Sequence, residues 1–224
     1  MTDTAVLYYS AGGKDGIALL DMLATHFPKV ICIYMYLIRD MEHIQPYIRW
    51  AENRYKGICD VRVIQVESFQ MDSIRKIGLF CDAEPDIKIR KVGEFEEEMR
   101  QKYGFHYAFS GMKGVDGYMK RMRLKMFAKT GYITEKGMVY PLAIWTNKEV
   151  LNYINSRNLI QPFVYMPECV SQGFSIDLPT LIHLRKFYPK DYQLTLQRFP
   201  YAEKLIYDYV KNNQDSTSLS KVRR

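Results

Sequence analysis

The feature that most constrains this chain is a glycine turn close to its N-terminus. Residues 5–9 predict a short buried strand, and the adjacent Gly12 and Gly13 allow a tight turn after it. A helical spacing of apolar residues begins at Ile17. The first N–H groups and the dipole of a helix favour negative charge, and Lys14 adds a cation at the same place. The stretch predicts a phosphate-binding turn, with an ordinary strand-to-helix corner as the competing interpretation.

Composition and charge narrow the class of protein. Apolar residues make up 47% of the 224 residues without any run of membrane-spanning length, so we expect a folded, cytoplasmic protein without membrane association. The net charge of +7 suits a polyanionic ligand but does not distinguish a nucleotide from a nucleic acid. Four cysteines, at positions 32, 59, 81 and 169, are scattered without a CxxC motif, so we expect neither a zinc site nor an iron–sulfur cluster.

Strand and helix patterns alternate along most of the chain. The predicted strands span 5–9, 30–38, 61–66, 105–110 and 139–140, and the predicted helices between them span 17–27, 43–55, 72–77, 94–103 and 118–129. This alternation predicts a doubly wound α/β fold with a mainly parallel sheet. Ligands of such sheets bind beyond the carboxyl ends of the strands, near the switch in strand order. We therefore expect a nucleotide close to residues 11–16 and 36–39.

A second glycine-containing loop, 111–116, follows the predicted strand 105–110 and precedes a basic helix. Cations on such a helix are usually solvent-facing charges. Arginine can, however, hold phosphate oxygens in a bidentate arrangement, and the loop lies where a polyphosphate would be bound. Both interpretations stay open for Arg121 and Arg123.

The C-terminal third predicts helices that follow the sheet. Thr146 and Glu149 form a capping box that opens one helix. Shorter helices are predicted at 178–187, 190–198 and 201–210. We predict a nucleotide-binding domain over 1–176, a helical extension packed on it over 177–210, and a disordered basic tail over 211–224.

These motifs together resemble the 3′-phosphoadenylyl-sulfate (PAPS) reductase family. The glycine turn is similar to the PP-loop, SGGKDS, of the ATP-pyrophosphatase and PAPS reductase superfamily, with Ala11 and Gly16 in place of its serines. The segment 141–165 resembles the family pattern P-[LI]-x-x-W-[ST]-x-x-[DE]-V-x-x-Y-I, followed by Asn-Leu and Pro-x-x-Tyr. The matching residues are Pro141, Leu142, Trp145, Thr146, Glu149, Val150, Tyr153, Ile154, Asn158, Leu159, Pro162 and Tyr165. The loop SGMKGVD looks most like the phage and mobile-element branch.

The resemblance implies a five-stranded parallel sheet of the adenine nucleotide α-hydrolase-like type, with a C-terminal helical extension. It places the phosphates on the glycine turn, the adenine at Tyr36 and Leu37, and the anionic end of the substrate near Lys113. The implied nucleotide-binding set is Ser10, Ala11, Gly12, Gly13, Lys14, Asp15, Gly16, Tyr36, Leu37, Gly111, Lys113, Arg121 and Arg123.

The leading hypothesis is an enzyme that binds ATP or a related adenine nucleotide and cleaves or activates it at the α-phosphate. Lys14 and Arg121 would stabilise charge on the phosphates, and Asp15 would act with them by helping to position Mg²⁺. The expected cofactor set is therefore ATP or PAPS as substrate together with Mg²⁺, and neither an iron–sulfur cluster nor zinc. An unidentified acceptor or partner protein completes this hypothesis.

Two other functions stay open, and so does the question of whether the chain is an enzyme. PAPS reductases act through a cysteine in a C-terminal Glu-Cys-Gly-x-His segment, which this chain lacks. A thiol-dependent PAPS reductase would have to use Cys169 as its nucleophile, although a lone structural thiol is the simpler interpretation. The third function is a non-catalytic accessory protein associated with a nucleotide or a nucleic acid, which the Ala11 and Gly16 departures favour. Homo-oligomer formation also stays open.

Overall fold

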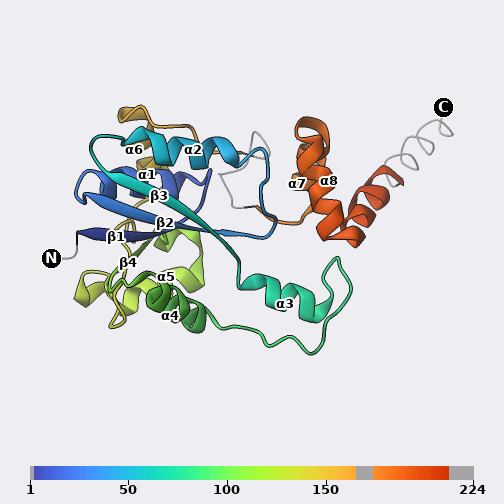
Figure 1. The fold of residues 1–224 in the computed structure, drawn as a ribbon, viewed down its shortest axis with the longest axis horizontal. Coiled ribbons are helices and arrows are strands. Elements are labelled where there is room, and N and C mark those ends of the chain that lie inside the picture. Colours follow the sequence, from blue (N-terminus) through green and yellow to red (C-terminus); the bar gives the residue numbers. More distant parts are fainter. Residues whose placement is uncertain (1–2, 165–173, 212–224) are drawn as a thin grey trace.

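The computed structural model describes residues 3–164 and 174–211, and it has an α/β fold (Figure 1). Five strands form one sheet in the order β3-β2-β1-β4-β5, and every neighbouring pair is parallel. The strands are β1 (Thr4–Tyr9), β2 (Lys29–Tyr36), β3 (Asp60–Glu67), β4 (Ala108–Ser110) and β5 (Met138–Val139). The predicted doubly wound parallel sheet of five strands is confirmed.

Helices cover both faces of the sheet (Figure 1). One face packs against α1 (Lys14–Ala24), α2 (Gln45–Arg54) and α6 (Asn147–Ser156), and the other against α4 (Val92–Tyr103) and α5 (Tyr118–Met126). The short helix α3 (Gln70–Ile77) follows β3. Pro46 lies in the first turn of α2, where its missing N–H costs nothing, and Thr146 caps α6 through the predicted box with Glu149.

The switch in strand order lies between β1 and β4. From β1 the chain builds outward through β2 to β3, and it then returns to the other side of β1 with β4. Val6 to Tyr8 of β1 pair with Ala108 to Ser110 of β4. Ser10 and Gly111 therefore follow two adjacent carboxyl ends, where a parallel sheet leaves room for a ligand.

The predicted strand over 105–110 and the predicted helix over 118–129 are both shorter in the structure than their patterns indicate. The prediction of a strand over 105–110 is wrong at its start, because β4 begins only at Ala108. The carbonyl oxygens of Phe105 and His106 accept hydrogen bonds from the Arg100 guanidinium. The helix expected over 118–129 ends at Met126, and a 3₁₀ turn, η2 (Ala128–Thr130), follows it.

The C-terminal helices pack beyond the carboxyl end of the sheet (Figure 1). They are α7 (Leu178–Phe187), α8 (Pro189–Arg198), the 3₁₀ turn η3 (Pro200–Ala202) and a final helix over 203–211. Leu181, Leu184 and Phe199 are fully buried in the same apolar core as α1 and α2. Of the predicted tail 211–224, only Lys211 belongs to the described residues. No helix among the described residues is long and apolar enough to cross a membrane.

Candidate nucleotide-binding site

The glycine turn after β1 is closed by backbone hydrogen bonds. The Gly13 N–H donates to the Ser10 carbonyl oxygen at 2.9 Å, and α1 begins at the next residue. Gly12 has a φ of +79°, a backbone conformation that side chains rarely adopt, and its carbonyl oxygen accepts from the Phe163 N–H at 2.8 Å. The turn is thus fixed both within itself and to the loop after α6, with the N-terminus of α1 at its end.

Three glycines are required by close packing around this turn. A Cβ at Gly13 would lie 2.6 Å from the Ser10 Oγ, and one at Gly16 would lie 2.8 Å from the Ser10 carbonyl oxygen. A Cβ at Gly111 would lie 2.9 Å from the Cβ of Asp15, because the loop after β4 packs directly on α1. Gly16 occupies the position of a serine in the PP-loop, and this close contact explains why a residue without a side chain is found there.

Alternating lysines and aspartates join the start of α1 to the loop after β4. We call this group the lysine–aspartate chain. The Lys113 Nζ lies 2.5 Å from the Asp15 Oδ1 and 3.1 Å from the Asp116 Oδ1. The Lys14 Nζ lies 3.3 Å from the Asp15 Oδ2, and the Lys120 Nζ lies 3.7 Å from the Asp116 Oδ2. The predicted residues Lys14, Asp15 and Lys113 are therefore brought together.

Lys113 is the centre of this chain and is fully buried. Burial would raise the pKa of the Asp116 carboxyl, but hydrogen bonding and the positive charge of Lys113 outweigh burial and hold that pKa below its usual range. The Lys113 ammonium is enclosed between two carboxylates. In this position it holds the loop after β4 against α1 and neutralises Asp15, rather than projecting from the surface toward a ligand.

The two predicted arginines of α5 have different surroundings. The Arg121 Nε donates to the Gly114 carbonyl oxygen at 3.3 Å, in the 3₁₀ turn η1 (Gly114–Asp116). Arg123 instead lines a cavity on the α4 and α5 face of the sheet. Arg121 therefore stays beside the lysine–aspartate chain, whereas Arg123 belongs to a different hollow.

A crevice of about 280 Å³ extends from the glycine turn along the carboxyl ends of the strands. Its walls come from the ends of β1, β2 and β4, from the segments that follow β1, β2 and β3, and from Phe174. The lining residues are Tyr8, Tyr9, Ser10, Ala11, Tyr34, Met35, Leu37, Ile44, Ser68, Gln70, Ser110 and Phe174. The combination of apolar walls with a few hydroxyl and amide groups is typical of a small-molecule site.

Some of the predicted site residues line this crevice, together with residues that the sequence reasoning missed. Leu37 lines it, but Tyr36 does not; the Tyr36 carbonyl oxygen accepts a hydrogen bond from the Ser68 N–H at 2.9 Å. Ser68, Gln70 and Ser110 supply side-chain polar groups and were not predicted. Their only signal in the sequence is their position at or just after a strand end.

A buried histidine–aspartate pair attaches the C-terminal helices beside this crevice, and it too was missed. The Asp191 carboxylate of α8 accepts from the backbone N–H groups of Glu42 and His43, at 2.6 and 3.0 Å, and lies 2.7 Å from the His43 Nδ1. Both side chains of this His43–Asp191 pair are fully buried. The His43 ring lies 6.4 Å from that of Phe174, a wall of the crevice, so the pair supports this wall.

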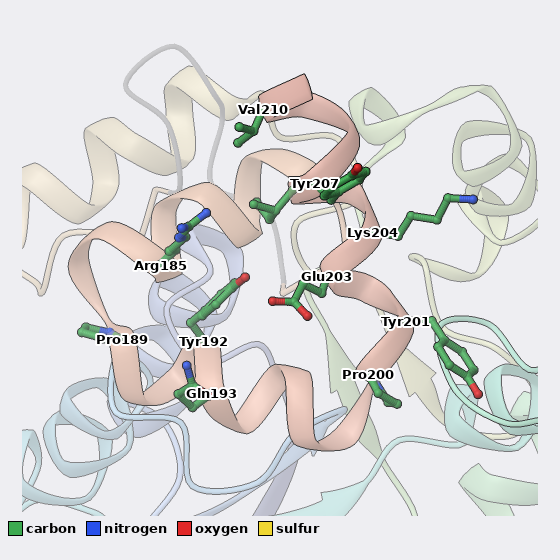
Figure 2. Close-up of a pocket in the computed structure, with 11 residues that line it drawn as sticks. Arg185, Pro189, Tyr192, Gln193, Pro200, Tyr201, Glu203, Lys204, Tyr207 and Val210 are labelled. Atoms are coloured by element: carbon green, nitrogen blue, oxygen red, sulfur yellow. The ribbon is translucent and has the colours of Figure 1, made fainter. Parts of the chain in front are cut away.

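A larger hollow of about 1010 Å³ lies among the C-terminal helices (Figure 2). It is open, lies between α7, α8 and the final helix, and is lined by residues such as Tyr192, Glu203 and Tyr207. It shares no residue with the crevice or the glycine turn. The candidate site is therefore assigned from the strand ends and the glycine turn, and not from the volume of the hollow.

The described cysteines are poor candidates for a nucleophile. Cys32 and Cys59 are buried and Cys81 is partly buried. Burial is the main cause that raises the thiol pKa of each of the three above its usual value, which disfavours the reactive thiolate. Cys169, the predicted nucleophile, lies outside the described residues.

Comparison with known families identifies a domain that covers most of this chain. The sequence model of the phosphoadenosine phosphosulfate reductase domain matches residues 5–174. The chain belongs to this family. The match runs from β1 to a wall of the crevice, and the narrower assignment to a phage and mobile-element branch stays a prediction. No curated protein sequence matches this family member.

Two solved structures are similar to this family member in fold. The PAPS reductase of Candida auris, in a phosphate complex, has 14% sequence identity and a TM-score of 0.44, with 72% of this chain and 76% of that chain covered. The U34-tRNA thiolase NcsA of Methanococcus maripaludis, with its [4Fe-4S] cluster, has 13% identity and a TM-score of 0.42, with 89% and 72% covered.

The cofactor prediction, Mg²⁺ with neither an iron–sulfur cluster nor zinc, is overturned. The thiolase NcsA carries a [4Fe-4S] cluster on a similar fold, so exclusion of such a cluster from scattered cysteines does not stand. Among the described residues, no group of three or more His, Cys, Asp or Glu side chains is placed to hold a metal ion. No cofactor is assigned to this chain.

Proposed function

We propose that this chain binds an adenine nucleotide across the carboxyl ends of β1, β2 and β4 and acts on it at the α-phosphate. The observation that carries this proposal is the crevice of about 280 Å³ that begins at Ser10 and Ala11 and reaches Leu37 beyond β2. It lies at the switch in strand order, where α/β sheets bind ligands. Membership of the PAPS reductase domain family supports the same ligand class.

In this proposal the phosphates lie on the glycine turn. The N-terminus of α1 supplies N–H groups and a favourable dipole, and Lys14 supplies a cation in the first turn. Asp15 would repel a phosphate at this place, but Lys113, at 2.5 Å, neutralises its carboxylate. A phosphate can then attract the Lys14 ammonium while Lys113 keeps Asp15 paired. Arg121 is our candidate for a second cation that stabilises developing negative charge.

The adenine lies at the other end of the crevice. Met35, Leu37 and Phe174 offer apolar surface for a planar ring, and Ser68 and Gln70 offer polar groups at its edge. Such a mixture orients a base because few polar groups are placed on an otherwise apolar wall. The acceptor that would follow activation of the nucleotide is a separate question.

The proposal is tested by titrating the protein with ATP, AMP and PAPS in a calorimeter, followed by assay of AMP and pyrophosphate release from ATP. We expect Lys14→Ala to weaken ATP binding about tenfold or more, which corresponds to about 1.4 kcal/mol. Lys148→Ala removes one exposed lysine of the α6 N-terminus and serves as the matched charge control. Absence of binding for all three nucleotides, or equal effects of the two variants, contradicts the proposal.

A thiol-dependent PAPS reductase is the second candidate, because the matched domain is named for that reaction. It depends on Cys169, since the described cysteines are buried or have raised pKa values. Release of sulfite from PAPS with a thiol donor, lost in Cys169→Ser, favours this candidate. Release that is absent, or unchanged in the variant, rejects it.

A further inference from the structure

A second cavity, of about 230 Å³, lies on the α4 and α5 face of the sheet and adjoins the nucleotide crevice. The two hollows share Tyr8, Met35 and Ser110, at the carboxyl ends of β1, β2 and β4. The remaining lining residues of this adjoining cavity are Phe69, Val92, Phe95, Glu96, Met112, Arg123, Met138 and Tyr140. A compound bound in it would lie directly beside a nucleotide in the crevice.

Most of the wall of the adjoining cavity is apolar and adaptable. Met35, Met112 and Met138 contribute thioether side chains, which fill irregular space and contact aromatic rings favourably. The ring centroid of Phe95 lies 6.5 Å from that of Tyr8 and 5.6 Å from that of Phe69. Such a wall suits an aromatic or thioether side chain.

The polar part of the wall is small and carries both signs of charge. The Tyr8 hydroxyl oxygen is buried and has no hydrogen-bond partner among the described residues. Arg123 and Glu96 line the same cavity, and neither belongs to an ion pair within 4.0 Å in the described part of the chain. Arg100, the other nearby cation, is occupied by the carbonyl oxygens of Phe105 and Lys136.

Glu96, Arg123 and Tyr140 line one cavity, and their charges act on one another there. Burial raises the pKa of the Glu96 carboxyl, and the positive charge of Arg123 acts to lower it. Burial also raises the pKa of Tyr140, with Arg123 lowering it and Glu96 raising it. A ligand with a single negative charge would be repelled by Glu96, and one with a single positive charge would be repelled by Arg123. A ligand with both charges satisfies both side chains.

We propose that the adjoining cavity binds an α-amino acid with an apolar side chain, as the second substrate of the nucleotide site. The ligand carboxylate pairs with Arg123 and accepts from the Tyr8 hydroxyl, the ammonium pairs with Glu96, and the side chain lies among Met112, Met138 and Phe95. Its role as a second substrate rests on the proposed nucleotide function, whereas its binding does not.

The test follows the methyl resonances of ¹³C-methionine-labelled full-length protein, with Met35, Met112 and Met138 assigned by single Met→Leu changes. The probe is L-phenylalanine; 3-phenylpropionate, which lacks the ammonium, and phenethylamine, which lacks the carboxylate, are the controls. We expect L-phenylalanine to shift Met112 and Met138, and each control to bind about tenfold more weakly or worse. Equal binding of either control overturns the assignment of a zwitterion.

Substitutions of the lining residues test whether L-phenylalanine binds in this cavity rather than elsewhere on the surface. Glu96→Gln and Arg123→Gln are each expected to weaken L-phenylalanine binding about tenfold, and Tyr8→Phe to weaken it less. Lys125→Gln removes a neighbouring exposed cation of α5 and is expected to change nothing. Unchanged binding in Glu96→Gln and Arg123→Gln, with their folded spectra preserved, overturns the inference.

A parallel titration with ATP distinguishes this inference from the proposed function. ATP in the crevice should shift Met35, which both hollows share, and leave Met138 in place. L-phenylalanine binding without ATP binding supports the amino-acid site and contradicts its role as a second substrate. ATP binding without any shift from L-phenylalanine overturns the inference alone.

Discussion

Two groups of hydrogen-bonded polar side chains connect distant parts of this chain, and they do so differently. The lysine–aspartate chain places the Lys113 ammonium between two carboxylates and ties the loop after β4 to α1. The His43–Asp191 pair uses one carboxylate to accept from two backbone N–H groups and to contact an imidazole, and it ties α8 to the segment before α2. The lysine–aspartate chain includes Lys14 and Asp15, which directly follow the glycine turn. The His43 ring of the other pair lies 6.4 Å from the ring of Phe174.

The two groups act on different parts of the candidate site. The lysine–aspartate chain sets the charge that a phosphate would meet, because it neutralises Asp15 beside the first turn of α1. The His43–Asp191 pair sets the shape of the crevice wall, because it fixes the C-terminal helices against the β2–α2 connection. Loss of the lysine–aspartate chain should therefore change the charge at the glycine turn and also lower the stability of the fold. Loss of the His43–Asp191 pair should instead loosen the C-terminal helices.

The largest effect is expected from Lys113→Met. It leaves the Asp15 and Asp116 carboxylates close together without their shared cation, and removal of one partner of a buried ion pair costs about 3–5 kcal/mol. Urea denaturation measures the free energy of unfolding. Lys120→Met removes the exposed end of the same chain, at 3.7 Å from Asp116, and should cost about 1 kcal/mol or less. Similar losses in both variants would contradict the central place of Lys113.

Asp191→Ala is expected to come next, at about 2–4 kcal/mol, because the backbone N–H groups of Glu42 and His43 and the buried His43 ring lose their acceptor. Amide hydrogen exchange should accelerate in α7 and α8 more than in β1 and β2. Asp191→Asn keeps one carbonyl acceptor and should lie between wild type and Asp191→Ala. Uniform acceleration throughout the sheet would show that the pair does not act locally.

Gly16→Ser restores the serine of the PP-loop and yet should destabilise this chain. Its Cβ would lie 2.8 Å from the Ser10 carbonyl oxygen that closes the turn, and we expect a cost of about 1–3 kcal/mol. Gly93→Ala in α4 is the matched control, since its Cβ meets no atom within 4 Å. It should be neutral or slightly stabilising by helix propensity. A stabilised Gly16→Ser variant would mean that the turn is looser than its packing indicates.

The smallest effect is a difference in acid sensitivity between the two groups. Burial lowers the pKa of His43, with Asp191 opposing and His183 adding to the decrease. A lowered folded-state pKa gives stability that is present above the unfolded value of about 6.5 and is lost as the pH falls below it. The lowered pKa of Asp116 gives stability that is lost only below about 4.

Chemical denaturation at about pH 7.5 and about pH 5.5 checks this order, with an expected loss of about 1 kcal/mol or less. His43→Asn keeps a donor toward Asp191 without titrating in this range, so part of the loss should disappear. If the variant retains the full pH dependence, the His43–Asp191 pair is not its source.

The fold was largely predictable because its signals are local. A continuous apolar run marked β2 and an alternating pattern marked β3. The alternation of strands and helices implied the parallel sheet with its switch point. The glycine turn was located for the same reason, because adjacent glycines before a helical pattern restrict the backbone over a few residues. The start of β4 was not predictable, since Arg100 from another helix binds the carbonyl oxygens of the segment before it.

The candidate site was predictable only in part because its other contacts are long-range. His43 and Asp191 are 148 positions apart, and no pattern connects them. The burial of Lys113 depends on two carboxylates that meet it only in the folded chain. The different surroundings of Arg121 and Arg123 were also hidden, because α5 has only one buried residue, Leu124, and its cations therefore show no clear inner face.

Photo-affinity labelling with 2-azido-ATP tests directly where the adenine is bound. The central claim places the adenine in the crevice beyond β2, away from the larger hollow of Figure 2. We expect the label on peptides that contain Leu37 or Ser68 and Gln70, with protection by unlabelled ATP and weakening in Lys14→Ala. A label that is protected by ATP but found on α7, α8 or the final helix would contradict the account.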